Sequence, residues 1–148
     1  MKAVIQRVKR AAVDVEGRTV GAIGRGFLIL LGVGCRDTEE EARKLWAKTV
    51  KLRIFNDENG RTNLSLKDVQ GEVLIVSQFT LYANCRKGNR PSFTEAGDPE
   101  KADRLYQYFT ELARQDVPGV ATGIFGAMMD ITLVNDGPFT IILDTDEL

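Results

Sequence analysis

The chain has 148 residues, with 20 Lys and Arg against 21 Asp and Glu, so its formal net charge is −1, and it contains no histidine. The absence of imidazole excludes Ser-His-Asp and Cys-His nucleophiles, histidine-ligated zinc and histidine acid–base catalysis. The near-zero charge argues against an extended phosphate-binding face, although it allows contact with one end of a nucleic-acid strand.

A hydrophobic share of 43% and a charged share of 28% are typical of a globular protein, and we expect one domain over residues 1–148. The longest apolar run, 27–33, is too short to span a bilayer. Cys35 and Cys85 are far apart, in no CxxC arrangement, and no secretory signal precedes them. These features predict a cytoplasmic protein with two structural thiols.

The first third of the chain is predicted to form strands separated by glycine-containing turns. Apolar and β-branched residues favour strands at 3–8, 11–15, 19–23 and 27–33. Gly17, Gly24 and Gly26 lie between these strands, where hairpin reversals need positive φ angles. The spacing of Gly21, Gly24 and Gly26 does not match a dinucleotide-binding fingerprint, so we interpret these residues as hairpin glycines.

Capping signals predict two helices. Thr38 and Glu41 have the spacing of a capping box, and apolar positions continue at helical period as far as Ile54. The turn at 56–60 then ends the first helix. Asp98 as N-cap and Pro99 at the first position begin a second helix that runs to residue 113.

The rest of the chain supplies the remaining strands. Residues 72–82 are β-rich, and 73–76 are apolar on both faces, which indicates the inside of a sheet. Residues 83–97 form a long loop of the kind that is usually functional. Strands follow at 120–125, 130–134 and 139–143. The predicted fold is a single α+β domain, mostly antiparallel and barrel-like, with two helices packed on the sheet.

Polar residues appear abruptly where the 72–82 strand reaches the long loop. Strand alternation puts Gln78 and Thr80 on one face, where they can point into a cleft, but spacing alone favours a solvent-exposed strand end. Thr80 has no histidine to act as its base. A main-chain oxyanion site at this strand end needs no such base.

Three other segments are candidate sites. Residues 135–140 are of the types that are common in turns. Because most X-Pro bonds in folded proteins are trans, we expect a trans Gly137-Pro138 bond. The long loop contains three basic residues a few positions before Phe93, namely Arg86, Lys87 and Arg90. They are either solvated loop charges or contacts for the end of a nucleic acid. The acidic residues at 144–147 lack convergent partners, so we expect no metal site, and nothing in the sequence calls for a cofactor.

Two motifs together resemble the signatures of the D-aminoacyl-tRNA deacylase family. They are Ser77-Gln78-Phe79-Thr80-Leu81 and Asn135-Asp136-Gly137-Pro138-Phe139-Thr140. Residues 1–8, 30–33, 87–93 and 122–127 also look like that family, in the same order and at matching spacing. A single motif would be weak support, whereas this ordered set is specific.

The resemblance implies a tRNA-editing hydrolase that cleaves the ester of D-aminoacyl-tRNA, and of glycyl-tRNA mischarged on tRNA(Ala), while rejecting L-aminoacyl esters. It implies a homodimer with the active site at the subunit interface, where a cis Gly137-Pro138 pair enters the partner's pocket. Arg7 would hold this pair, and the opposite wall would be formed by Ser77, Gln78, Phe79 and Thr80. Ser92, Phe93 and Met129 match family positions near the pocket.

We expect backbone amides near Gln78 and Phe79 to bind the oxyanion while the 2′-hydroxyl of the terminal adenosine assists water, because an aminoacyl ester is already activated. The alternatives are a non-catalytic binder of the tRNA 3′ end and an esterase with a Thr80 nucleophile. Two residues depart from the family pattern. Phe139 stands where Val is usual, and Met128 stands where an acidic residue is common.

Overall fold

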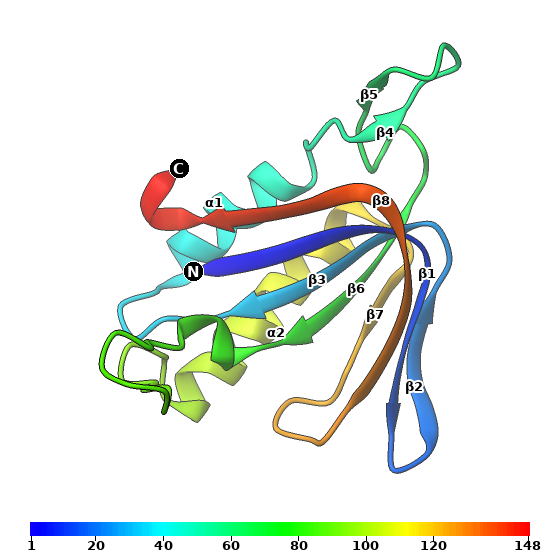
Figure 1. Ribbon diagram of the computed structural model, residues 1–148. Coiled ribbons are helices and arrows are strands. Elements are labelled where there is room, and N and C mark those ends of the chain that lie inside the picture. The colour runs from blue at the N-terminus through cyan, green and yellow to red at the C-terminus, as the bar shows by residue number, and fades with distance from the viewer.

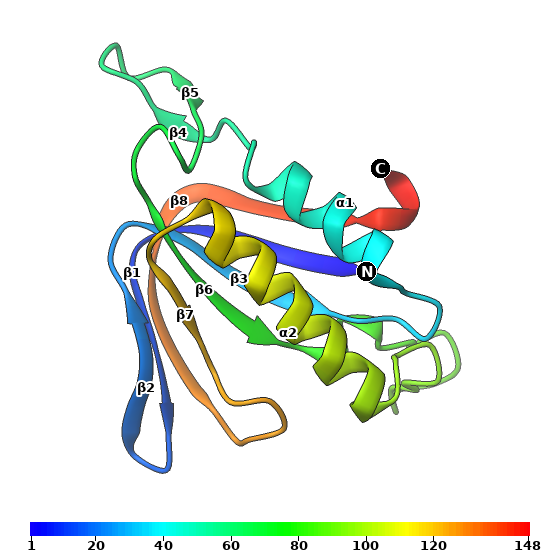
Figure 2. The same cartoon turned by 180° about the vertical axis from the view of Figure 1, so that it is seen from behind.

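The computed structural model describes all 148 residues and has one strongly curved sheet with both α-helices on one of its faces (Figures 1 and 2). This confirms the predicted α+β class. Neither α-helix is long and apolar enough to cross a membrane. The elements in chain order are β1 (Lys2–Val15), β2 (Arg18–Ile23), β3 (Gly26–Gly32), α1 (Glu39–Thr49), β4 (Phe55–Asn56), β5 (Thr62–Leu64), β6 (Glu72–Ser77), the 3₁₀-helix η1 (Phe79–Tyr82), α2 (Pro99–Asp116), β7 (Val120–Thr122), β8 (Asp130–Asp144) and the 3₁₀-helix η2 (Thr145–Glu147).

The sheet is organised around the long strand β1. Its strand order is β2-β1-β3-β6-β7, and β8 also pairs with β1. The pairs that include β1 are antiparallel, whereas β6 runs parallel to both β3 and β7. The two end strands approach each other, since a Cβ on Gly21 of β2 would lie 2.5 Å from the Thr122 carbonyl of β7. The sheet is therefore nearly closed.

Both faces of β3 and β6 are buried, as the continuous apolar runs predicted. Phe27 and Ile29 belong to a core of 22 residues shared with α1 and α2, and Leu28 and Leu74 belong to a second core of 7 residues on the opposite face. Alternate residues of one strand therefore serve different cores. The carboxyl end of β6 emerges between these cores.

Helix α1 has the predicted capping box but is shorter than predicted. Glu41 accepts from the Thr38 backbone at 2.6 Å and from its hydroxyl at 2.7 Å, and these bonds lower the pKa of Glu41. The helix ends at Thr49, and a tighter turn follows it, in which the Lys51 N–H donates to the Lys48 carbonyl and the Leu52 N–H to the Thr49 carbonyl, both at 3.2 Å. The apolar residues after this turn therefore do not continue the helix. Residues 55–64 then form the small β4–β5 hairpin.

Three other local predictions were wrong. Residues 3–8 and 11–15 form one continuous strand, β1. Residues 135–138 lie within the single strand β8 rather than in a turn between two strands, and the register against β1 shifts beside them. Cys35 and Cys85 are exposed free thiols and not parts of the core.

Candidate functional site

A hollow of about 780 Å³ lies at the carboxyl end of β6, where the sequence turns polar. Nine of its 15 lining residues are hydrophobic, so it offers an apolar surface with a few polar groups at one edge. The start of α2 and the β7–β8 connection close its sides. Its wall includes Ser77, Gln78, Phe79, Phe93, Ala102, Met129 and Ile131.

The polar edge of the hollow is a change of backbone direction and not a continued strand. The Gln78 backbone N–H donates to the Leu31 carbonyl at 2.8 Å, and η1 begins at the next residue. The alternation predicted for 77–80 is therefore wrong. Gln78 and Thr80 nevertheless meet, because the Gln78 side-chain amide donates to the Thr80 hydroxyl.

The turn into η1 leaves backbone donors free. The first N–H groups of a helix have no acceptor within it, and those of Phe79 and Thr80 donate to no other part of the chain. The Gln78 backbone N–H is occupied by the Leu31 carbonyl, so of the amides expected to bind an oxyanion only those after Gln78 remain free to do so. Thr80 is exposed and outside the hollow's lining, and its hydroxyl has no basic partner.

Close packing holds η1 in place. A Cβ on Gly32 would lie 3.0 Å from Leu81 Cβ, and one on Gly34 would lie 2.7 Å from the Tyr82 hydroxyl. That hydroxyl donates to Asp37 at 3.3 Å, and Asp37 also accepts from the Met1 amino group at 2.8 Å. Burial, reinforced by Asp37, raises the pKa of Tyr82, so the phenol stays a hydrogen-bond donor.

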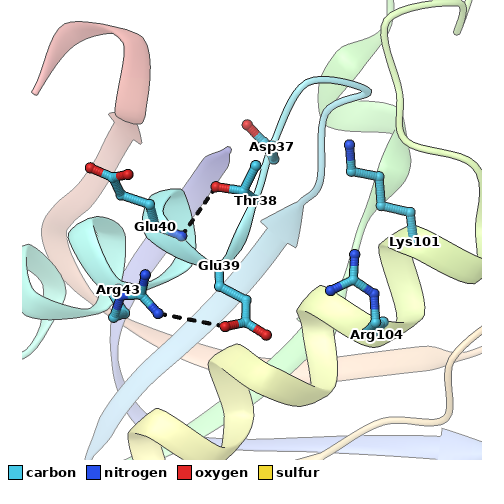
Figure 3. A pocket seen from close by; sticks show the side chains of 7 residues that line it. All are labelled: Asp37, Thr38, Glu39, Glu40, Arg43, Lys101 and Arg104. Carbon is cyan, nitrogen blue, oxygen red and sulfur yellow. Dashed lines mark hydrogen bonds and ion pairs between the residues drawn. The ribbon is translucent and has the colours of Figure 1, made fainter.

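Asp37 and Tyr82 were missed as support residues by sequence reasoning. The only available signal was that a carboxylate directly precedes the cap of α1. Asp37 also borders a charged hollow of about 390 Å³ between the amino ends of α1 and α2 (Figure 3). Its lining has three acidic and three basic side chains, and Arg43 pairs with Glu39 at 3.6 Å.

An aromatic pair connects the hollow to the long loop. The rings of Phe79 and Phe93 are 5.1 Å apart in an edge arrangement. Ser92 is exposed and pairs with Asn84 through two backbone bonds of 2.8 and 2.9 Å, so it shapes the loop without lining the hollow. Met129 lines the hollow, and its sulfur would be 2.5 Å from a Cβ on Gly123.

Arg7 is the centre of the second group of predicted site residues. Its side chain is buried, and its Nε donates to the Asp136 carbonyl at 3.1 Å and pairs with the Asp136 carboxylate at 3.2 Å. Its Nη1 donates to the Ile54 carbonyl at 2.6 Å, and its guanidinium lies 4.5 Å from the Phe139 ring centre. The departure at Phe139 therefore gives Arg7 a stacking partner.

The Gly137-Pro138 bond is cis, contrary to the base-rate expectation and in agreement with the family resemblance. Both residues are exposed. The Asn135 side chain donates to the Arg7 carbonyl at 2.9 Å and to the Phe139 carbonyl at 3.1 Å, which ties the segment down on both sides. Arg7 and Asn135 together present the Gly137-Pro138 main chain to solvent.

The two groups of site residues do not meet within one chain. Arg7 pairs with Phe27 and Phe27 with Val73, so Arg7 is level with a residue four positions before Ser77. Four residues of strand span about 13 Å. Ser77, Gln78, Phe79, Phe93 and Met129 gather at the hollow, and Arg7, Gly137 and Pro138 lie elsewhere.

Comparison with known proteins supports the resemblance. The family model described as D-Tyr-tRNA(Tyr) deacylase matches residues 4–144. A Thermotoga petrophila protein named D-aminoacyl-tRNA deacylase is 57% identical over 148 residues, covering 100% of this chain and 99% of that protein. A protein of the same name from Dehalococcoides mccartyi is 59% identical over 145 residues, covering 98% and 95%.

Two solved structures have the same fold. One, described as "c-Myc DNA Unwinding Element Binding Protein", superposes with a TM-score of 0.93 at 44% identity, covering 97% of this chain and 98% of that one. The other, described as a probable eukaryotic D-amino acid tRNA deacylase, gives a TM-score of 0.79 at 21% identity. The full-length sequence matches show that this chain belongs to the D-aminoacyl-tRNA deacylase family of hydrolases.

Proposed function

We propose that the protein hydrolyses the ester between a D-amino acid and the terminal ribose of tRNA and leaves L-aminoacyl esters intact. Family membership supports the reaction class. The observation that carries the proposal is an apolar hollow lined by Phe79, whose backbone N–H is free, as is that of the next residue, Thr80. Aminoacyl-tRNA is formed in the cytoplasm, which is where we expect the protein to act.

The two N–H groups would bind the oxyanion that develops when water attacks the ester carbonyl. Preorganised donors of this kind lower the barrier because they need no reorganisation during the reaction. No side-chain nucleophile takes part, and the 2′-hydroxyl of the terminal adenosine assists the water. The Thr80 hydroxyl orients the Gln78 side chain instead of attacking the substrate.

Chirality would be read by a second copy of the chain. In a homodimer, Gly137 and Pro138 of one protomer enter the hollow of its partner, and their carbonyls contact the substrate amino group. Their exposure and their separation from Ser77 within one chain support this arrangement. A main-chain wall held by Arg7 excludes an L side chain, whereas glycine passes, so glycyl-tRNA(Ala) is a second substrate.

Matched esters test the proposed activity. D-tyrosyl-tRNA and L-tyrosyl-tRNA are incubated with the protein, and release of tyrosine is followed. The proposal expects rapid loss of the D ester alone. Protection of both esters would indicate a tRNA-end binder, and equal release of both would refute the chiral wall.

Proline substitution tests the oxyanion site. Phe79→Pro removes the Phe79 N–H at the first position of η1, where proline is tolerated, and Phe79→Ala keeps it. We expect kcat of the proline variant to fall about 10²–10³-fold below that of the alanine variant. Thr80→Ala should keep substantial activity, and complete loss in a folded Thr80→Ala protein would favour a Thr80 nucleophile. A 2′-deoxy substrate should react slowly.

Mixed dimers test the exchange between subunits. Pro138→Gly weakens the wall, so this variant should release the L ester. An excess of inactive Phe79→Pro protomers would place every active hollow opposite an intact wall and restore rejection of the L ester. If the added protomers change nothing although heterodimers form, the wall acts within its own chain.

A further inference from the structure

The loop beside the hollow ends in a short, well-formed hairpin. Two backbone bonds between Asn84 and Ser92, of 2.8 and 2.9 Å, close its base, and the Arg86 N–H donates to the Asn84 side chain at 3.0 Å. Gly88 has a φ of 77°, which the reversal of the chain requires. Residues 85–91 form its tip, which we call the hairpin tip.

The hairpin tip carries unbalanced positive charge. It contains Arg86, Lys87 and Arg90 and no acidic residue. All three side chains are exposed, and none takes part in an ion pair within the chain. The charged hollow in Figure 3, in contrast, has equal numbers of acidic and basic side chains. In a chain of net charge −1, the hairpin tip is therefore a local concentration of positive charge.

The hairpin tip is joined directly to the wall of the candidate active site. Phe93 follows the hairpin base by one residue, lines the hollow and packs against Phe79. Four residues of extended chain, the distance from Ser92 to Gly88, reach about 13 Å. A substrate whose terminal ester lies in the hollow therefore has its adjoining atoms within reach of these cations.

We infer that the hairpin tip binds the phosphates of the nucleotides that precede the esterified ribose. This inference rests on the proposed function, and it adds a subsite on the same protomer as the hollow. Three cations on one short arm match consecutive phosphates, and such contacts carry no sequence information. The subsite would hold the end of any tRNA while the hollow and the chiral wall select the ester.

Salt dependence gives the inference a quantitative form. Each phosphate neutralised by a cation contributes about 0.7 to 0.9 to the slope of log affinity against log salt concentration. Three contacts therefore contribute a slope of about 2. Raising salt fourfold should weaken binding by the native protein about 16-fold more than binding by a protein that lacks these contacts.

The test compares two triple variants of equal net charge. Arg86→Ala, Lys87→Ala and Arg90→Ala remove the cations of the hairpin tip. The control replaces Lys48, Lys51 and Arg114 by alanine; all three are exposed, Lys48 and Arg114 lie in the last turns of α1 and α2, and Lys51 lies in the turn after α1. KM is measured from 50 to 200 mM salt for D-tyrosyl-tRNA and for D-tyrosyl-adenosine, which has no phosphate, and filter binding is measured with uncharged tRNA.

We expect the hairpin-tip variant to have a higher KM for D-tyrosyl-tRNA and a salt slope smaller by about 2, with kcat and hydrolysis of D-tyrosyl-adenosine unchanged. The control should behave like the native protein. Equal tRNA slopes for all three proteins would overturn the inference while leaving the proposed function intact. If the native protein hydrolysed neither ester, the proposed function would fail, and the slope for uncharged tRNA would still decide the inference.

Discussion

Replacing Arg7 by lysine tests how the Gly137-Pro138 segment is supported. The guanidinium serves two carbonyls at once, those of Asp136 at 3.1 Å and Ile54 at 2.6 Å, and also stacks on Phe139. A lysine ammonium keeps the charge but is a single point without a planar face. It can retain the ion pair with Asp136, and it must give up the Ile54 carbonyl and the stacking.

The cost follows from these lost contacts. A hydrogen bond from a charged donor contributes about 1.5–3 kcal/mol, and a cation–π contact contributes about 0.5–1 kcal/mol or more when desolvated. Arg7 is 4% exposed, so water replaces neither contact. We expect Arg7→Lys to lower the free energy of unfolding by about 2–4 kcal/mol, which corresponds to a fall in Tm of about 5–15 °C in a domain of this size.

The assay is denaturant unfolding at a fixed protein concentration, because any association of protomers would make stability concentration-dependent. Arg10→Lys is the matched control, since Arg10 lies on the same strand and is exposed, and it should stay within about 0.5 kcal/mol of the native protein. On the proposed function, Arg7→Lys should also release more L-tyrosyl ester. If the free energy of unfolding of Arg7→Lys were within 0.5 kcal/mol of the native value, the two carbonyl contacts and the stacking of Arg7 would not stabilise the protein as argued.

Two further substitutions examine contacts away from Arg7. Gly34→Ala places a Cβ 2.7 Å from the Tyr82 hydroxyl, so we expect a loss of stability of about 1–3 kcal/mol in unfolding experiments, and an unchanged Tm would show that Tyr82 moves freely. Hydrogen bonds from Lys67 and then Trp46 lower the pKa of Asp116, so its stabilising effect is present above pH 4 and is lost as pH falls through the lowered pKa. Asp116→Asn should therefore cost about 0.5–1 kcal/mol at pH 7, after allowance for its partial exposure, and almost nothing near pH 2; a cost independent of pH would contradict this.

Local sequence signals predicted the elements whose cause is local. The capping box at Thr38 and the Asp98-Pro99 start of α2 were correct, because each satisfies backbone donors within one turn. The two-sided burial of β6 was also correct, since a continuous apolar run has no solvent face. The α1 terminus was not, because a spacing of two and a spacing of three or four overlap over a few residues.

The conformation of residues 135–138 and the support of η1 depend on contacts between residues far apart in the sequence. Asn135 and Gly137 are residue types that are common in turns. Here β8 pairs with β1 both before and after them, so the unpaired residues of β8 are accommodated by a shift in register. The support of η1 by Asp37 depends on Tyr82, 45 positions away. Neither side chain has a distinctive local pattern.

The arrangement of the two groups of site residues bears on how chirality could be read. Within one chain, Phe79 lines an open hollow, and neither Gly137 nor Pro138 belongs to its lining. On the proposed function, a single protomer would therefore supply the oxyanion donors but no wall on one side of the α-carbon. Arg7 holds the residues on either side of the Gly137-Pro138 pair, through the carbonyl and carboxylate of Asp136 and through the ring of Phe139. On the proposed function, a wall formed by Gly137 and Pro138 is rigid only if these contacts are kept, so we expect Arg7 to influence selectivity without touching the substrate.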